Sequence, residues 1–322
     1  MQAPVSGNQQ ARQAIKMVFQ LVVKYFNPLL AKNVLIPSSL VKKVVGKIYL
    51  SALQGGYGSQ PMIVETCAGR MELSANDITS CFPLLFCTWE PGITHFVEAN
   101  LKPGDRFVDI GANIGFYTLL AHKLGARPTA FEPSPRVLPL LYRNLELNGI
   151  DRGVVECIAL SNAAGTARLF EGPAGNQGRS SLSPDSDQID NASHLVETAP
   201  VEAYADVLRA ARMIKIDVEG HEAHLLKYIL SSEAALRDDH ILIVEIDLRN
   251  NSHLKTLLRE QMRRGLQVFW IENDYTVRFY RKRRNRVIAL NEQTLSDFEG
   301  RRVDVIMSSA PVDFPTSAFD LN

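Results

Sequence analysis

The sequence predicts an α/β fold whose core is a doubly wound, mostly parallel sheet. From Asp105 onward, short apolar strand patterns alternate with amphipathic helix patterns, which is typical of parallel strands joined by crossover helices. A glycine-containing turn stands between the first predicted strand and the first predicted helix of this region, at the carboxyl edge where open parallel sheets bind ligands. The last strand patterns have no long helix between them, which favours a terminal antiparallel hairpin.

The predicted elements follow one another in a regular order. Strands are expected at Arg106–Ile110, Pro128–Phe131, Val154–Leu160, Met213–Ile216, Ile241–Ile246, Val268–Ile271, Val277–Tyr280 and Val303–Met307. Helices are expected at Phe116–Leu124, Pro135–Asn148, His221–Leu230 and Leu254–Arg264. The segment Glu171–Leu195 is rich in Gly, Ser, Asn, Asp and Pro, and it predicts a long loop that serves as a lid, binds a ligand or is disordered.

Residues 1–100 are predicted to form an N-terminal helical extension with a short hairpin. Apolar residues recur at helical spacing within residues 15–26 and 40–48, and strand patterns at Met62–Glu65 and Arg70–Leu73 flank a turn at Ala68–Gly69. The helices are expected to be a packing appendage or a dimer surface, and lysines beside their apolar faces also allow a peripheral membrane contact. Residues 101–310 are then the main domain, and residues 311–322 a C-terminal tail.

Composition narrows the class of protein. The 35 Lys+Arg balance the 35 Asp+Glu, which disfavours a nucleic-acid partner. The four cysteines lack zinc-ligand spacing and are expected to be reduced, mostly buried thiols; no specific metal site is predicted. The N-terminus lacks a secretory pattern, and the lysines and the proline in its apolar stretch disfavour a membrane span. We therefore expect a cytoplasmic protein, and the sequence leaves its oligomeric state open.

The glycine-containing turn predicts the kind of ligand. Gly111 and Gly115 allow a tight turn and a close approach of the backbone to a ligand. Glu132 ends the second predicted strand, 23 residues after Asp109, which is close to the spacing at which a carboxylate binds a ribose diol. A dinucleotide fingerprint requires glycine where Asn113 stands, because a side chain there crowds a pyrophosphate. The turn therefore favours a smaller ligand with a zwitterionic amino-acid tail, held by Asp109 and backbone groups, over NAD(P).

From about Trp89 to Ser308 the sequence resembles the FkbM family of class I methyltransferases. The segments that carry the resemblance are Trp89–Pro91, Gly104–Thr118, Phe131–Pro133, Ala159–Asn162 and Ile214–Glu222. The last of these is the most particular to the family, and Asn162 stands where many relatives look acidic. The resemblance implies a Rossmann-like, seven-stranded sheet with an antiparallel terminal strand. It also implies S-adenosylmethionine as the methyl donor and O-methylation of a hydroxyl, often on a sugar or a secondary metabolite.

The segment Lys215–Glu222 predicts the chemistry at a second edge, where a central strand ends and a helix begins. Asp217 and His221 are the candidate catalytic residues, because both can take a proton from the acceptor hydroxyl. Lys215 is a candidate acceptor-binding residue and is expected to pair with a neighbouring acid rather than to act directly. Glu219 is expected to bind the acceptor or to cap the following helix. Purely structural roles are the alternatives for all of them, and Asp217, Glu219, His221 and Glu245 are also candidate metal ligands, at spacings that match no specific metal site.

Three further features carry less specific predictions. Glu90 is a candidate cofactor residue, with an ordinary helix-start acid as the alternative. Asn176, Arg179 and Ser180 on the long loop are candidates for closing over the acceptor. The basic run Arg278–Arg286 predicts a solvated hairpin tip, or else a contact with an anionic acceptor or an acidic membrane surface.

The leading function is therefore a small-molecule or glycan O-methyltransferase. A nicotinamide-dependent oxidoreductase is the alternative enzyme class, and Asn113 disfavours it. A non-catalytic S-adenosylmethionine-binding protein is the third alternative, and the Asp217–Glu222 cluster disfavours that function.

Overall fold

The computed structural model describes most of the chain beyond residue 60. The described residues are 61–74, 77–172, 176–182, 192–231, 236–249, 252–275, 277–280, 284–298 and 300–321. The predicted N-terminal helices and the central part of the basic run, residues 281–283, lie outside them. The chain divides into two compact units, one formed by residues up to Trp89 with 174–176, and one by 90–173 with 177–322. No helix in the described residues is both long and apolar enough to cross a membrane.

The first unit contains the predicted hairpin. Strands β1 (Met62–Glu65) and β2 (Arg70–Leu73) pair antiparallel, as the sequence predicts. Helix α3 (Ile78–Phe86) follows, and the side chain of its N-cap Asp77 accepts a hydrogen bond of 2.9 Å from the Thr79 N–H. The free cysteines are less uniformly buried than predicted, since only Cys81 and Cys87 are buried and both have a pKa raised mainly by burial.

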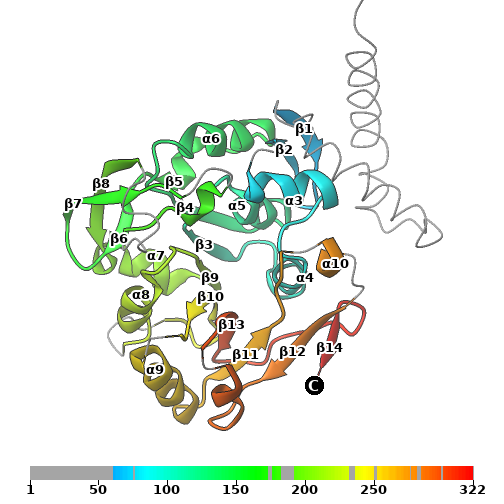
Figure 1. Ribbon diagram of the computed structural model, residues 1–322, viewed down its shortest axis with the longest axis vertical. Coiled ribbons are helices and arrows are strands. Elements are labelled where there is room, and N and C mark those ends of the chain that lie inside the picture. Colours follow the sequence, from blue (N-terminus) through cyan, green and yellow to red (C-terminus); the bar gives the residue numbers. More distant parts are fainter. Residues whose placement is uncertain are drawn as a thin grey trace, which may run out of the picture. The chain divides into compact units, whose positions relative to one another are not determined.

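The second unit is built on one large sheet (Figure 1). Its described strands lie in the order β14-β12-β11-β13-β10-β9-β3-β4-β5. Their bounds are β3 Arg106–Ile110, β4 Arg127–Phe131, β5 Val155–Glu156, β9 Met213–Ile216, β10 Ile241–Asp247, β11 Gln267–Ile271, β12 Asn285–Ala289, β13 Arg302–Ser308 and β14 Phe319–Leu321. Strands β5, β4, β3, β9 and β10 are mutually parallel, and β13 runs antiparallel between β10 and β11. In the order of the sheet, the strands β5, β4, β3, β9, β10, β13 and β11 form the predicted sheet with its reversed strand β13. Strands β12 and β14 extend this sheet beyond β11.

Helices lie against both faces of this sheet. Their bounds are α4 Pro91–Asn100, α5 Phe116–Lys123, α6 Leu138–Leu147, α7 Ala205–Ala210, α8 Glu222–Ile229, α9 Ser252–Arg263 and α10 Val277–Tyr280. Leucines of α7, α8 and α9 share one apolar cluster with alternate strand residues such as Val108, Ile216 and Val244. The strand residues between them, including Asp109 and Lys215, therefore point to the opposite face.

The predicted third strand, Val154–Leu160, is in fact two strands in two sheets. Strand β5 pairs with the end of β4, whereas β6 (Ala159–Ser161) belongs to a separate three-stranded sheet in the order β6-β8-β7. The reason is that β4 ends at Phe131, so residues beyond Glu156 have no neighbour in the main sheet. Strands β7 (Gly165–Phe170) and β8 (Ser193–Pro200) complete the small sheet, and they flank the predicted long loop.

The predicted strand at Val277–Tyr280 is wrong, because these residues form the short helix α10. Phe279 and Tyr280 are consecutive and both buried. Successive strand residues point to opposite faces, whereas a helical turn can bury two neighbours on one side. Strand β11 pairs antiparallel with β13 on one side and with β12 on the other, and pattern analysis missed β12.

The second unit includes more of the chain than the predicted main domain, 101–310. Helix α4 and the C-terminal residues are joined by the buried side chain of Asn100. It donates a 2.8 Å hydrogen bond to the carbonyl of Asp313 and accepts a 2.8 Å bond from the N–H of the same residue. The ring of Phe314 packs against that of Phe96, with 5.1 Å between centroids, and β14 pairs with β12. Packing thus includes residues 90–100 and 311–321 in the unit.

Asn100→Ala tests this connection. The substitution removes the three hydrogen bonds of the Asn100 side chain, one to the carbonyl of Phe96 and two to the backbone of Asp313. We expect the free energy of unfolding to fall by about 2–3 kcal/mol, measured by urea denaturation. Asp206→Ala, in an exposed ion pair, is the control and should change stability by less than about 0.5 kcal/mol. Equal stability of the two variants would show that the hydrogen bonds of Asn100 contribute nothing to the stability of the unit.

Candidate cofactor and acceptor site

The turn after β3 is held against two neighbouring segments. The N–H groups of Gly111 and Ala112 both donate to the carbonyl of Phe131, at 2.9 and 3.0 Å. Gly111 has φ +85°, and a Cβ on it would lie 1.9 Å from the carbonyl oxygen of Asp217. The sequence predicts that glycine is required here so that a ligand can approach. In the structure, the group that lies closest to Gly111 is the backbone of Asp217, which follows β9.

The second glycine of the turn also faces protein atoms. Gly115 has φ +89°, and a Cβ on it would lie 2.5 Å from Cδ1 of Leu141 on α6. The same helix provides Asn144, whose side chain donates a 2.9 Å hydrogen bond to the carbonyl of Ile114. The turn is therefore fixed from both sides, by α6 and by the segment after β9.

Asp109 is buried below the turn. It is 2% exposed and accepts a 2.6 Å hydrogen bond from the hydroxyl of Thr118 on α5. Burial raises its pKa, and the ammonium group of Lys215 and the Thr118 hydroxyl partly oppose this shift. Asp109 thus connects β3 to α5 and lies beside Lys215. Its direct contact with a ligand stays a prediction.

Glu132 follows β4 with its carboxylate held by backbone groups. One oxygen accepts from the N–H of Asn113 at 2.8 Å, and the other accepts from the N–H of Ser134 at 2.9 Å. Burial raises its pKa to about 7, although these two hydrogen bonds oppose the shift. Because each carboxylate oxygen can accept more than one hydrogen bond, the group can still accept from the hydroxyls of a ribose.

Asn113 has the features expected of a ligand contact. Its φ is +50°, a left-handed conformation that asparagine tolerates better than most residues. Its side-chain oxygen is buried and has no hydrogen-bond partner. Buried polar atoms without partners are rare in folded proteins, so this oxygen needs a donor. A cofactor that carries an ammonium group, beside a ribose at Glu132, fits these residues.

One face of the sheet carries a row of charged side chains at this edge. Strand pairing places Asp109 level with Lys215. Lys215 is buried, donates a 2.8 Å hydrogen bond to Asp217, and lies 4.9 Å from the ring centroid of Tyr117. Burial alone would lower the pKa of Lys215, but the carboxylates of Asp217, Glu90 and Asp109 raise it above its usual range. The predicted pairing of Lys215 with an acid is confirmed, and its ammonium group is occupied by that acid.

Asp217 remains ionised and partly accessible. Its side chain is 26% exposed. Burial raises the pKa of Asp217, but the adjacent ammonium group of Lys215 lowers it by more, so the pKa lies below its usual value. Asp217 therefore presents a permanent negative charge at the end of β9, beside the turn that contains Gly111.

A second group of charges lies beside Asp217. Arg302 on β13 forms ion pairs with Glu219 and with Glu245, the latter at 3.1 Å. Oxygens of Asp217, Glu219 and Glu245 lie within 4.8 Å of one another, close enough to coordinate a cation. The guanidinium group of Arg302 already supplies positive charge to two of these carboxylates. Burial, and then the charge of Asp217, raise the pKa of Glu245 well above its usual value.

Glu90 connects this site to two other segments. It is 2% exposed and accepts hydrogen bonds from the hydroxyls of Tyr117 and Tyr275, at 2.8 and 2.6 Å, and from the Asn273 amide, at 3.0 Å. Its backbone N–H donates to the hydroxyl of Tyr280. Its side chain makes no capping bond to α4, so an ordinary helix-start role is not what the structure shows. A contact of Glu90 with the cofactor stays a prediction.

His221 has different neighbours from the other predicted residues of its segment. Its ring stacks on that of His224, with 4.9 Å between centroids, and its Nε2 is buried without a hydrogen-bond partner. Burial, and then His224, lower its pKa. Glu222 rather than Glu219 binds the turn before α8, accepting from the Gly220 N–H at 2.9 Å. The structure thus groups Lys215, Asp217 and Glu219, whereas His221 packs against its own helix.

The described part of the long loop contacts the turn after β9. The hydroxyl of Ser181 donates to the carbonyl of Glu219, and the charge of Arg179 opposes the upward pKa shift of Glu219. Ser180 instead accepts a 3.2 Å hydrogen bond from the Gly172 N–H within the loop. Asn176 belongs to the first compact unit, and its role at the acceptor stays a prediction.

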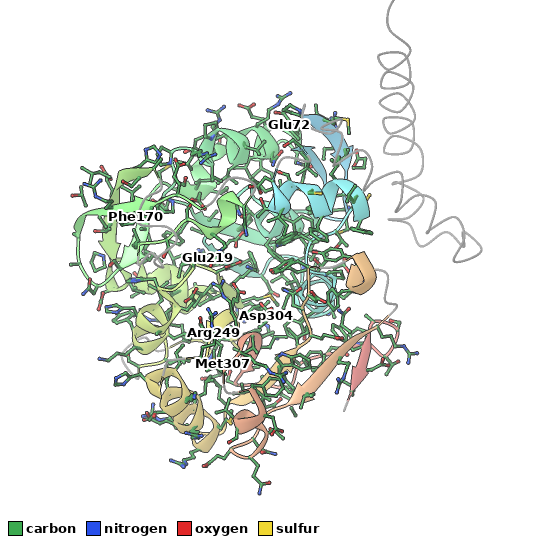
Figure 2. All side chains as sticks on the ribbon, in the orientation of Figure 1. Glu72, Phe170, Glu219, Arg249, Asp304 and Met307 are labelled. Atoms are coloured by element: carbon green, nitrogen blue, oxygen red, sulfur yellow. The ribbon has the colours of Figure 1, made fainter. Side chains whose placement is uncertain are left out.

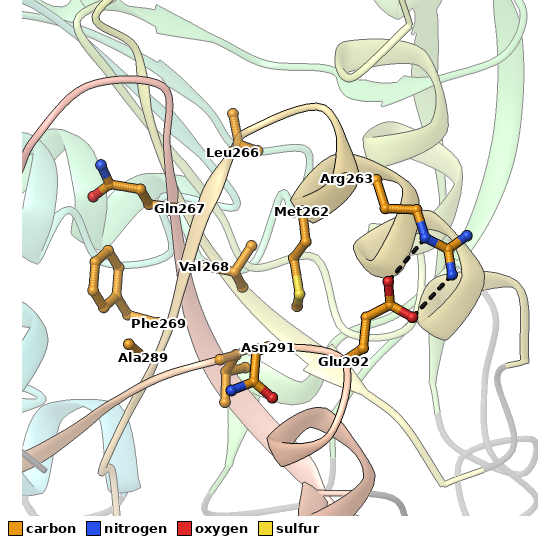
Figure 3. A pocket seen from close by; sticks show the side chains of 10 residues that line it. Met262, Arg263, Leu266, Gln267, Val268, Phe269, Ala289, Asn291 and Glu292 are labelled. Atoms are coloured by element: carbon orange, nitrogen blue, oxygen red, sulfur yellow. Dashed lines mark hydrogen bonds and ion pairs between the residues drawn. The ribbon is translucent and has the colours of Figure 1, made fainter.

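A surface hollow lies away from this site, between the end of α9 and the start of β11 (Figure 3). Gln267 begins β11 and pairs with Ser308, which also pairs with Ile241 at the start of β10. The hollow therefore lies at one end of the strands, and Asp217 lies at the opposite end. Its most polar feature is the ion pair of Arg263 with Glu292, at 2.9 Å.

Comparison with known proteins identifies the family. The methyltransferase FkbM domain matches residues 109–264, which include the turn after β3, Glu132 and the segment after β9. The strand order, the reversed β13 and these site residues together define a class I S-adenosylmethionine-dependent methyltransferase. The chain belongs to the FkbM family of these enzymes.

Two curated relatives illustrate its range. Over 215 residues the chain is 25% identical to hexuronic acid methyltransferase AglP of Haloferax volcanii, covering 65% of this chain and 83% of that protein. Over 79 residues it is 39% identical to 31-O-demethyl-FK506 methyltransferase FkbM of Streptomyces tacrolimicus, covering 24% of this chain and 29% of that protein.

Two solved structures show more distant likenesses. Fibrillarin of Aeropyrum pernix with natively bound S-adenosyl-L-methionine is 14% identical, with a TM-score of 0.34, and the match covers 67% of this chain and 71% of that one. P. horikoshii TYW2 in complex with MeSAdo is 14% identical, with a TM-score of 0.38 and coverages of 85% and 86%. Both scores are too low to define the fold, which the strand order defines.

Gly111→Ala tests the contact between the two turns. We expect the variant to lose about 2–4 kcal/mol of stability, because the new Cβ meets the Asp217 carbonyl in addition to the strain at positive φ. Gly149→Ala is the matched control. Gly149 also has positive φ but has nothing within 4 Å, so only about 1 kcal/mol should be lost. Urea denaturation measures both, and equal losses would mean that the close approach imposes no constraint.

Glu132 should make cofactor affinity depend on pH. Its ionised carboxylate accepts more hydrogen bonds than the protonated form, and its pKa is about 7. Affinity for S-adenosylhomocysteine, measured by calorimetry, should therefore fall as the pH is lowered from 8 to 6. Glu132→Ala should weaken binding by roughly 1.5–3 kcal/mol at pH 8 and remove this pH dependence. Wild-type affinity in the folded variant would remove Glu132 from the cofactor site.

Proposed function

We propose that this enzyme transfers the methyl group of S-adenosylmethionine to a hydroxyl oxygen of a sugar, glycan or secondary metabolite. The observation that carries the proposal is the position of Asp217. Its partly exposed carboxylate is kept ionised by buried Lys215, and its backbone carbonyl touches the turn expected to hold the cofactor. Asp217, a group that can accept a proton, thus lies beside the turn that is expected to hold the methyl donor. The names of the two relatives, a hexuronic acid and an FK506-type methyltransferase, support small hydroxylated acceptors.

The cofactor would be held by residues of the turn after β3 and the end of β4. Glu132 would accept hydrogen bonds from the ribose, and the unpaired oxygen of Asn113 would accept one from the ammonium group. When bound, S-adenosylmethionine supplies an electrophilic methyl group on a positively charged sulfur.

The enzyme's residues align the acceptor and remove its proton. Methyl transfer is an in-line displacement, so positioning of the acceptor oxygen and exclusion of water account for much of the rate. Asp217 would accept a hydrogen bond from the acceptor hydroxyl and take its proton as the new O–C bond forms. Lys215 would act as a positioning residue, because it fixes and ionises Asp217 without being accessible itself.

The alternative functions have less support. In a nicotinamide-dependent oxidoreductase the Asn113 side chain would crowd a pyrophosphate, and the family is a methyltransferase family. A non-catalytic S-adenosylmethionine-binding protein would not need the Lys215–Asp217 pair at the acceptor edge. A cytoplasmic location and a membrane contact through the N-terminal helices stay predictions.

Ligand binding and label transfer test the proposed function. We expect S-adenosylhomocysteine, but neither NAD nor NADP, to raise the melting temperature. Labelled methyl from S-adenosylmethionine should then appear as an alkali-stable ether in molecules of an extract from the source organism. Stabilisation by NAD(P), or label only in alkali-labile esters, would contradict O-methylation of a hydroxyl.

Asp217→Asn separates catalysis from structure. The variant keeps the shape of the side chain but removes the proton acceptor, so turnover should fall by about 10²–10⁴ with S-adenosylhomocysteine affinity within a few-fold of wild type. His221→Ala should lower turnover less, because its ring packs on His224 rather than beside Asp217. Glu197→Gln, an exposed carboxylate on β8, is the control. Wild-type turnover in Asp217→Asn would show that positioning alone drives the reaction.

A further inference from the structure

We propose that Tyr117 is a positioning residue for methyl transfer. Its hydroxyl satisfies Glu90 and its ring holds the ammonium group of Lys215, so that this ammonium group binds Asp217 rather than Glu90. The inference rests on the proposed function, in which Asp217 takes the proton of the acceptor hydroxyl. It deepens that function by naming the residue that decides which acid Lys215 binds.

Lys215 binds the less buried of two nearby acids. Lys215 is 6% exposed and Glu90 is 2% exposed, whereas the side chain of Asp217 is 26% exposed. Buried charges are usually paired with one another, so Glu90 is the partner expected for this ammonium group. Lys215 instead donates its hydrogen bond to Asp217, at 2.8 Å. Burial lowers the pKa of Lys215, and Asp217 and then Glu90 raise it, so the charge of Glu90 also acts on the ammonium group.

Tyr117 on α5 contacts both Glu90 and Lys215. Its hydroxyl donates a 2.8 Å hydrogen bond to Oε2 of Glu90, and its ring centroid lies 4.9 Å from Nζ of Lys215. Burial, and then the charge of Glu90, raise the pKa of Tyr117 well above its usual value, so the phenol keeps its proton and remains a donor. A cation near an aromatic face is attracted to the ring. One buried side chain thus gives Glu90 a neutral donor and gives the ammonium group a second contact.

Neutral donors occupy both oxygens of Glu90. Oε1 accepts from the hydroxyl of Tyr275 at 2.6 Å and from the amide of Asn273 at 3.0 Å. Hydrogen bonds to a carboxylate stabilise its charge, so Glu90 does not require the ammonium group as a partner.

The positive charge therefore goes to the acid at the acceptor edge. Asp217 lies beside Glu219, which Figure 2 labels, and it is the partly exposed member of the Lys215 ion pair. The ammonium group keeps this accessible carboxylate ionised and fixes one of its oxygens. Tyr117 thus acts on the reaction through Lys215, without touching the acceptor.

Tyr117→Phe tests the proposal because it keeps the ring and removes only the hydroxyl. Oε2 of Glu90 then loses its donor, and we expect the ammonium group to move to it. A crystal structure of the variant should show Nζ of Lys215 about 3 Å from Glu90 and no longer bonded to Asp217. Tyr204→Phe is the matched control. Its hydroxyl also donates to a glutamate, Glu156, at 3.2 Å, but Tyr204 packs against the opposite face of the sheet, so the Lys215–Asp217 contact should persist.

Turnover is measured as labelled methyl transferred into a small-molecule extract of the source organism at saturating S-adenosylmethionine. In Tyr117→Phe we expect it to fall about 10–100-fold per folded molecule, the scale of a small misplacement of a reacting group. The extract concentration that gives half the maximal rate should stay the same. Adding Glu90→Gln to Tyr117→Phe removes the competing charge and should restore most of the turnover. Saturating cofactor keeps any contact of Glu90 with S-adenosylmethionine out of this comparison.

Three results would overturn the inference. They are a Lys215 that stays on Asp217 in Tyr117→Phe, a variant that is less stable but has wild-type turnover per folded molecule, and a double variant without recovery. Failure of the proposed function gives a different result, because the wild-type enzyme would then bind S-adenosylhomocysteine but transfer no label to the extract. The crystal structures would still decide which acid Lys215 binds.

Discussion

The carboxyl edge of the large sheet depends on the burial of the Lys215 ammonium group. This cation lies among the carboxylates of Asp217, Asp109 and Glu90, and its charge offsets part of the cost of placing acids in the interior. The same group contacts the ring of Tyr117 on α5. Lys215 therefore connects strands β3 and β9 with helix α5 and with Glu90 at the start of α4. Without its charge, the acids around it would have to take up protons or separate.

The two halves of the site are joined by the backbone as well. The Gly111 turn, where we propose that the cofactor binds, lies against the carbonyl of Asp217, where we propose that the acceptor binds. Glu90 adds a third connection, since it binds Tyr117 of α5 and residues 273 and 275 after β11. The turn that contains Gly111, Asp217 and residues 273 and 275 are thus parts of one network of contacts.

Sequence patterns predicted the parts of this protein that depend on local order. The strand Arg106–Ile110, the helix after it and the hairpin of the first unit have strong local periodicity, and all are confirmed. The patterns failed where long-range pairing decides. The Val154–Leu160 segment divides because β4 ends early, and Val277–Tyr280 becomes helical so that two neighbouring aromatic rings are buried together. Local alternation contains neither constraint.

The sequence by itself determined the cofactor class, because the glycine turn and Glu132 are close in the chain and carry a spacing specific to their chemistry. It also singled out Lys215, Asp217 and Glu219, which form one segment. Only the tertiary structure decided that Arg302 and Asp304 join them, that Glu245 lies within reach of Asp217 and Glu219, and that His221 stacks on His224 instead. The alternation of residues along a strand predicts which side chains share a face of the sheet. Only the order of the strands in the sheet decides which side chains of different strands become neighbours. That order is set by packing between residues far apart in the chain.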